Sequence, residues 1–139
     1  MAFHQGMNFS LEHIGLCAQS PEHLVSWYVK TLDARVIFDN RQKPPAYLLQ
    51  VGSGSLIEIY PAQHSVQEPQ TNITQGLRHL AIRVASLKDA KALLEQRGVS
   101  FPDTIKPAGG GGSVLFFKDP EGHLLHLVER PEESPLARF

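Results

Sequence analysis

Four side chains that can bind a metal ion stand at matched places in two halves of the chain. His13 lies in LEHIGLCA and Glu58 in SLIEIYP, while His79 lies in LRHLAIRV and His126 in GHLLHLVE. The interval from His13 to His79 is 79 minus 13, or 66 residues, and that from Glu58 to His126 is 126 minus 58, or 68 residues. Imidazole and carboxylate groups are donors for divalent cations, and one cation needs several donors from distant segments. The spacing therefore predicts a duplicated unit that directs two pairs of donors at one cation.

The same order of elements surrounds both pairs. Pro21 opens an amphipathic run after the first histidine, and Ser86 opens another after the second, with Asp89 completing a capping box. Three β-prone stretches follow each run: Arg35 to Phe38, Tyr47 to Val51 and Leu56 to Tyr60, then Val99 to Ile105, Val114 to Lys118 and His123 to Val128. The pattern predicts an α+β fold made of two β-α-β-β-β modules. We expect a single domain over residues 1–139, with module 1 at about 11–61, a linker at about 62–76, module 2 at about 77–130 and a tail at 131–139.

Strand parity predicts which way the donors point. Side chains alternate between the two faces of a strand, so His13 and Glu58 lie opposite their isoleucine and leucine neighbours, and the same holds in the second half. The apolar faces can then pack on the helices while the four donors share the inward face. Tyr60 and Arg83 have this inward parity and are candidate substrate contacts, Arg83 by pairing with an anionic group, with surface or core roles equally open. Cys17 shares the face of His13 by parity, but its size favours a core position.

Composition excludes several classes of protein. The chain has 139 residues, of which 42% are apolar, and a formal net charge of −1 without a basic stripe, which speaks against nucleic-acid and membrane partners. No apolar run reaches the roughly 20 residues of a transmembrane helix, and the start lacks the order of a secretion signal. A single cysteine agrees with a reducing compartment, so we expect a cytoplasmic protein.

The chain resembles a known superfamily at these same motifs. The strings HIGL, LIEIYP, GLRHLAI and DPEGHLLHLVE resemble the metal-bearing strands of the vicinal oxygen chelate superfamily, the glyoxalase, bleomycin-resistance and extradiol-dioxygenase group. The resemblance covers about Leu11 to Glu129. It implies paired modules in a cup-shaped mixed sheet with helices outside, a divalent metal and usually a homodimer. Its ligand positions fall on His13, Glu58, His79 and His126.

The fourth ligand position departs from the usual pattern of that superfamily. In most metal-dependent members a glutamate stands four residues after the glycine of the DP-x-G turn, where this chain has His126. The nearest carboxylate, Glu129, has the opposite parity and would need a bulge to turn inward. Three neutral imidazoles and one carboxylate leave a divalent cation with a formal charge of +1, so it stays more electrophilic. Glu58 then remains as the inward base, and glyoxalase I, dioxygenase and thiol-transfer reactions that use the missing glutamate are disfavoured.

Three classes of function stay open. The first is a metal-dependent lyase, isomerase or oxygenase that acts on a small molecule chelating a divalent metal through oxygen. The others are a non-catalytic binding or resistance protein of the same fold, and a dimer with a purely structural metal. The donors suit Zn, Ni, Co, Fe, Mn or Cu. We also expect the loop Gly109 to Gly112 to be flexible, and residues 131–139 to be a loose tail or an arm across a partner.

Overall fold

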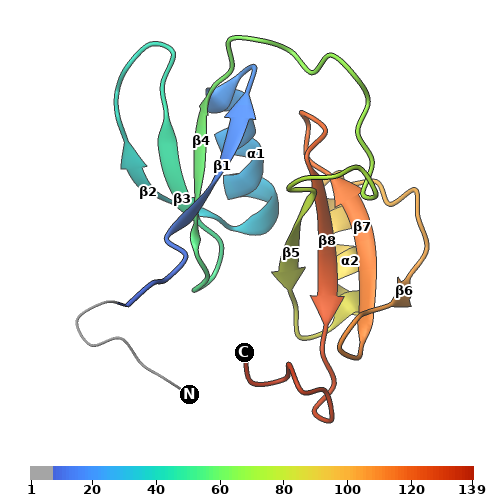
Figure 1. Ribbon diagram of the computed structural model, residues 1–139. Helices are drawn as coiled ribbons and strands as arrows, with labels where there is room; N and C mark the ends of the chain where they lie inside the picture. The colour runs from blue at the N-terminus through green and yellow to red at the C-terminus, as the bar shows by residue number, and fades with distance from the viewer. Residues whose placement is uncertain (1–7) are drawn as a thin grey trace. The chain divides into compact units, whose positions relative to one another are not determined.

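The computed structural model describes residues 8–139 and divides into two compact units, one up to Gln63 and one from His64 onward. Each unit contains a four-stranded mixed sheet and one helix (Figure 1). The α+β fold class and the paired β-α-β-β-β modules predicted from the sequence are confirmed.

The first unit runs through five elements. They are β1 (His13–Ala18), α1 (Pro21–Leu32), β2 (Arg35–Asp39), β3 (Tyr47–Gln50) and β4 (Leu56–Pro61). The strand order is β1-β4-β3-β2, in which β1 and β4 are parallel and the other neighbours are antiparallel. The helix covers one face of this sheet, against β1, β3 and β4.

The second unit repeats this arrangement. Its elements are β5 (His79–Arg83), α2 (Leu87–Gln96), β6 (Lys106–Pro107), β7 (Ser113–Lys118) and β8 (Leu124–Glu129), with strand order β5-β8-β7-β6. The register repeats as well, because Glu58 pairs with Gly15 in the first unit and His126 pairs with Ala81 in the second. The two units therefore match in strand register as well as in the order of their elements.

Strand parity accounts for the core of each unit. In the first unit the helix side of the sheet is apolar and buried: Leu16, Ala18, Leu49, Ile57 and Ile59. In the second unit it is formed by Leu80, Leu115, Phe117, Leu125 and Leu127. Cys17 was expected in the core but is exposed, because it lies between Leu16 and Ala18 and so points to the opposite face.

One predicted strand is wrong. Residues 99–105 form no strand, and the corresponding strand is only the two-residue β6, which pairs with β7. Pro102 lacks the N–H that a ladder needs. Asp103 then binds locally, to the Lys106 ammonium at 2.9 Å and to the Thr104 N–H at 3.3 Å. These contacts favour a loop over an extended segment.

The last residues fold back on their own unit. The Arg130 guanidinium donates to the carbonyl oxygens of Gly109, at 2.6 Å, and Gly111, at 2.8 Å. The Ser134 hydroxyl donates to the carbonyl of Gly110 at 2.5 Å. The loop that we expected to be flexible is thus tied to Arg130 and to the C-terminal segment 131–139, which makes hydrogen bonds within its own unit.

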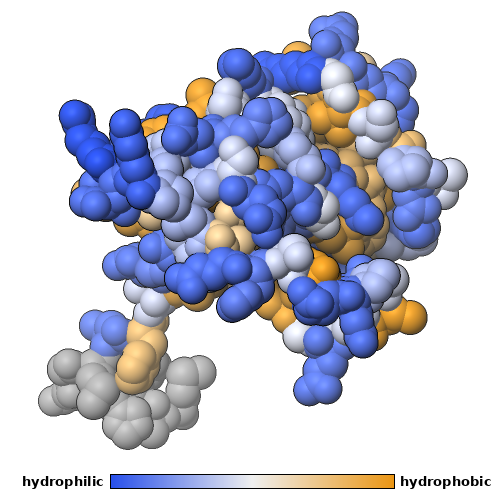
Figure 2. All heavy atoms as spheres, turned by 90° about the horizontal axis from the view of Figure 1, so that it is seen from above, coloured by the Kyte–Doolittle hydropathy of each residue, from blue (hydrophilic) through white to orange (hydrophobic). Residues whose placement is uncertain are grey.

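No helix within residues 8–139 has the length and apolar character needed to cross a membrane. Figure 2 shows one face of the molecule, where hydrophilic residues cover most of the area and hydrophobic atoms emerge in separate places. The large exposed apolar side chains include three consecutive residues of the edge strand β2, Val36, Ile37 and Phe38.

Candidate metal centre

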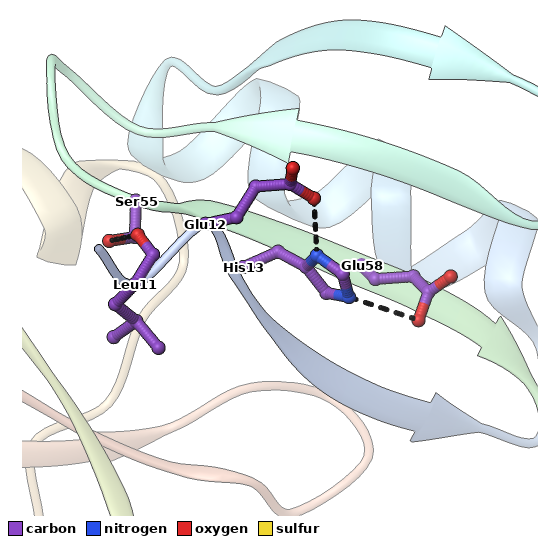
Figure 3. Close-up of polar contacts among 5 residues, drawn as sticks. All are labelled: Leu11, Glu12, His13, Ser55 and Glu58. Carbon is purple, nitrogen blue, oxygen red and sulfur yellow. Dashed lines mark hydrogen bonds and ion pairs between the residues drawn. The ribbon is translucent and has the colours of Figure 1, made fainter. Parts of the chain in front are cut away.

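The first pair of donors lies on neighbouring parallel strands. His13 on β1 stands two residues before Gly15, which is the partner of Glu58 on β4, so the two side chains share a face. His13 Nε2 lies 3.9 Å from Glu58 Oε1 (Figure 3). Two ligands about 2.1 Å from one ion at a tetrahedral angle are about 3.4 Å apart. A closing movement of about half an ångström would therefore bring this nitrogen and oxygen into ligand geometry.

The second pair occupies the equivalent place in the other unit. His79 on β5 stands two residues before Ala81, the partner of His126 on β8. The two imidazole centroids are 4.8 Å apart and their planes are inclined at 48°. His126 is only 7% exposed, and this burial is the main cause that lowers its pKa. The neutral imidazole, which is the form that binds a metal, is favoured there.

Phe116 closes one side of the second pair. It lies on β7 directly opposite His126, and the two ring centroids are 4.9 Å apart in an edge arrangement. The ring of His79 lies 5.8 Å from the same phenyl ring. Sequence reasoning missed Phe116, although the hairpin turn at 119–122 fixes the register that places it beside His126.

Each of the three imidazoles is held through its Nδ1 atom. His13 Nδ1 lies 2.9 Å from Glu12 Oε1, and His79 Nδ1 lies 2.8 Å from Asn72 Oδ1. His126 Nδ1 lies 3.1 Å from the carbonyl oxygen of Leu127. Sequence reasoning missed both side-chain partners.

Tyr60 lies close to the first pair. A Cβ added to Gly15 would meet Tyr60 Cε1 at 3.0 Å, so the phenol ring lies over this glycine, which is the strand partner of Glu58. Tyr60 is 37% exposed and is therefore open to contact with a ligand. The absence of a side chain at Gly15 gives the ring its space.

Arg83 is engaged by main-chain oxygens. Its Nη1 donates to Leu136 at 3.0 Å and to Phe139 at 2.5 Å, and its Nη2 donates to Ala137 at 2.8 Å. An anionic substrate would reach this guanidinium by exchanging with these oxygens. Arg83 anchors segment 131–139 to β5, a role that sequence reasoning missed because no local pattern links residues so far apart.

Two other candidates have structural tasks. Glu129 Oε1 accepts a hydrogen bond from the Leu87 N–H at 2.7 Å, so this carboxylate caps the first turn of α2 on the helix side of the sheet. Glu129, the alternative to His126 as a ligand, is therefore engaged with α2 in this structure. His123 Nδ1 lies 2.7 Å from Asp119 Oδ2, and Asp119 Oδ1 accepts from the His123 N–H at 3.0 Å. This pair stabilises the turn before β8.

Within residues 8–139, no group of three or more histidine, cysteine, aspartate or glutamate side chains is gathered closely enough to hold a metal ion. The four donors are brought together as two pairs, one in each unit.

Comparison with known proteins agrees with this architecture. A family model described as Glyoxalase/Bleomycin resistance protein/Dioxygenase superfamily matches residues 10–127. The chain belongs to this superfamily. It is 29% identical over 124 residues to the uncharacterized protein YwkD of Bacillus subtilis (strain 168), covering 87% of this chain and 97% of that protein.

Solved structures share the glyoxalase fold with this chain. A glyoxalase family protein from Enterococcus faecalis has a TM-score of 0.73 and 26% identity, over 86% of this chain and 97% of that chain. The fosfomycin resistance protein FosX of Listeria monocytogenes, crystallised with Mn(II) and 1S,2S-dihydroxypropylphosphonic acid, has a TM-score of 0.70 and 22% identity, over 95% and 98% of the two chains. A resistance protein of the same fold has thus been crystallised with a divalent metal.

The donors in this chain suit a divalent metal of the kind found in the superfamily. Imidazole nitrogens and a carboxylate bind Zn, Ni, Co, Fe and Mn, and the buried imidazole of His126 favours its neutral form. The acceptors on the three Nδ1 atoms leave each Nε2 as the free lone pair. The residues present therefore fit the group.

Proposed function

We propose that this chain is a metal-dependent enzyme, a lyase, isomerase or oxygenase, that acts on a small molecule chelating a divalent metal through oxygen. His13 and Glu58 of the first module and His79 and His126 of the second are the proposed ligands. The cation is Zn, Ni, Co, Fe or Mn. The proposal includes a cytoplasmic homodimer.

The observation that carries the proposal is the repeated donor pair. Both units place one donor on the first strand and one on the last, in the same register and on the face opposite the helix. A histidine that served only the core would need no counterpart at the equivalent position of the other unit. Membership of a superfamily that includes metal-binding proteins supports the same conclusion.

The roles of the side chains follow from their positions. A bound divalent cation would polarise the oxygen atoms of a chelating substrate. Glu58, half-exposed and beside His13, is the carboxylate available to accept a substrate proton, so we assign it as the catalytic base as well as a ligand. Tyr60 is placed to contact the substrate beside this carboxylate, and Arg83 would meet an anionic group that replaces the oxygens of segment 131–139.

The charge of the donor set favours an oxygen-rich, anionic substrate. With three neutral imidazoles and one carboxylate, the cation keeps a formal charge of +1, and the second pair contributes no negative charge. Phe116 supplies an apolar wall beside His126, and this lower local polarity would strengthen the attraction between a bound cation and an anionic ligand.

Metal analysis of protein purified without an affinity tag tests the proposal. We expect one divalent cation per chain, and we expect both His13→Ala and His79→Ala to lose it, because each removes a donor from the same site. His23→Ala changes an exposed histidine of α1 and serves as the matched control that should retain the cation.

Three results would contradict the proposal. A chain that takes up no transition metal would exclude the enzyme and the structural-metal alternatives and leave the binding protein. Two independent ions per chain, or a cation that survives His79→Ala, would contradict sharing between the modules. Full turnover of an identified substrate by a metal-loaded Glu58→Gln variant would contradict the assignment of Glu58 as the catalytic base.

A further inference from the structure

Two residues outside the donor set contact the Nδ1 atoms of its exposed histidines. We propose that Glu12 and Asn72 are positioning residues that hold His13 and His79 as Nδ1–H tautomers, with Nε2 presented to the cation. This inference rests on the proposed function, and it adds two residues that no sequence motif marks.

The partner atoms of His13 and His79 decide which ring nitrogen carries the proton. An ionised carboxylate and an amide oxygen only accept hydrogen bonds, so the proton must lie on the histidine nitrogen that faces them. Glu12 Oε1 faces Nδ1 of His13 at 2.9 Å, and Asn72 Oδ1 faces Nδ1 of His79 at 2.8 Å. Nε2 is therefore the lone pair in both rings, and a metal binds the deprotonated nitrogen.

Figure 3 shows the geometry of the first case. The imidazole of His13 lies between two carboxylates, with Nδ1 toward Glu12 and Nε2 toward Glu58. The shorter contact, at 2.9 Å, holds the proton, while Nε2 and Glu58 Oε1, 3.9 Å apart, are the atoms that would help to hold a cation. The two carboxylates therefore have different tasks.

The main chain around Glu12 is fixed by the neighbouring strand. The Leu56 N–H donates to the Glu12 carbonyl at 2.8 Å, and the Ser55 hydroxyl donates to the Leu11 carbonyl at 2.9 Å. These bonds continue the β1–β4 ladder beyond His13. The backbone of Glu12 is therefore positioned by β4, the strand that carries Glu58.

Asn72 performs the same task from the segment that joins the two sheets. The Thr71 N–H donates to the Thr74 hydroxyl at 3.0 Å, and the Thr74 N–H donates to the Thr71 carbonyl at 3.0 Å, which closes a turn around Asn72. Arg78 next to His79 binds Gln70 of the same segment at 2.8 Å. The segment thus returns to the start of β5, and it presents an acceptor to His79 there.

His126, the third imidazole, also has a hydrogen-bond acceptor at Nδ1, but this acceptor belongs to the main chain. His126 Nδ1 faces the carbonyl of Leu127, which also only accepts. All three proposed imidazole ligands thus have an acceptor on Nδ1, as metal-binding histidines do in general. The buried histidine uses the main chain, whereas the two exposed ones need side chains that a substitution can remove.

Long-range ¹H–¹⁵N correlation spectra of the metal-free protein, labelled at histidine, test the tautomers directly. At about pH 8.5, where an ordinary imidazole is neutral, we expect His13 and His79 to show Nδ1 protonated and Nε2 unprotonated. Glu12→Ala should shift His13 toward the Nε2–H form, and Asn72→Ala should do the same for His79. Glu12→Gln retains an acceptor oxygen and should restore the wild-type pattern. His123, held by Asp119 at 2.7 Å, is the internal control and should not change.

Calorimetric titration with Co(II) provides the second readout. Loss of an orienting partner typically weakens metal affinity about 10- to 100-fold, and we expect this loss in the two alanine variants and a smaller one in Glu12→Gln. Glu133→Ala removes an exposed carboxylate in segment 131–139 and should leave affinity unchanged.

The two measurements separate the failure of this inference from that of the proposed function. Nε2–H tautomers in the wild type, or tautomers unaltered by the alanine variants, overturn the positioning role even if metal binds. Altered tautomers with unaltered Co(II) affinity also overturn it. If the tautomers respond as expected but the wild type binds no metal, the proposed function fails, and the hydrogen bonds then have no positioning role toward a cation.

Discussion

Replacing Gly112 by alanine should destabilise the second unit far more than the same change at Gly109. Gly112 has φ +103, and a Cβ there would lie 1.9 Å from the Glu129 carbonyl oxygen at the end of β8. Gly109 belongs to the same loop, but its Cβ would have no heavy atom within 4 Å. Both substitutions therefore add the same methyl group, but only the one at residue 112 places it in occupied space.

The expected magnitude follows from two terms. A non-glycine residue at such a φ costs about 1–3 kcal/mol, and forcing an atom into an occupied space costs about 1–3 kcal/mol more. Reduced freedom of the unfolded chain offsets about 0.4–1 kcal/mol of this. We therefore expect Gly112→Ala to lower the free energy of unfolding by about 2–4 kcal/mol, and Gly109→Ala to leave it unchanged or to raise it by up to about 1 kcal/mol.

Urea denaturation of both variants, followed by far-ultraviolet circular dichroism, measures this difference. The midpoints report stability if the free energy of unfolding depends on urea concentration with the same slope in both variants and the wild type. Equal free energies of unfolding for Gly112→Ala and Gly109→Ala would refute the conclusion that Gly112 lies directly against the Glu129 carbonyl in a conformation that requires glycine.

Three further outcomes are expected. Glu129→Ala should lower the free energy of unfolding by about 1–2 kcal/mol in urea denaturation, because the first N–H of α2 loses its part-buried acceptor. Arg83→Ala should speed cleavage after Glu133 by a glutamate-specific protease, because segment 131–139 loses three hydrogen bonds, while Arg83→Lys should restore only part of the protection. Chelation of the metal-loaded protein should lower its thermal stability, by about 2.7 kcal/mol where the ion stood at 100 times its Kd, and should have no such effect on His79→Ala.

The fold was predictable because two local rules apply along the whole chain. Alternation of apolar and polar residues determined the inward face of each strand, and the repeated intervals determined which strands correspond. The strand at 99–105 was mispredicted since its apolar residues outweighed Pro102, which the ladder cannot accommodate. The single-domain boundaries stay a prediction.

The partners of the donors could not be predicted in the same way. Glu12 directly precedes His13, and adjacent residues of a strand normally point to opposite faces. The alternation rule therefore predicts no contact between these two side chains. Asn72 and the oxygens bound by Arg83 reach the strands from segments without regular structure. Such contacts form only when the chain folds, and no periodic pattern in the sequence links the residues that make them.

The two donor pairs differ in charge and in exposure, which explains why a histidine is tolerated where the superfamily usually has a glutamate. The first pair combines His13 with Glu58 in a half-exposed place, where water can solvate an ionised carboxylate before any cation arrives. In the second pair, His126 is nearly enclosed by Phe116 and its own strand. An ionised carboxylate in that place would lose its hydration without a compensating charge, whereas a neutral imidazole keeps its one hydrogen bond to the Leu127 carbonyl. The second unit can therefore fold with His126 already buried while His79 stays exposed, and the negative charge of the proposed centre is confined to the first unit, which is where a proton acceptor would be needed.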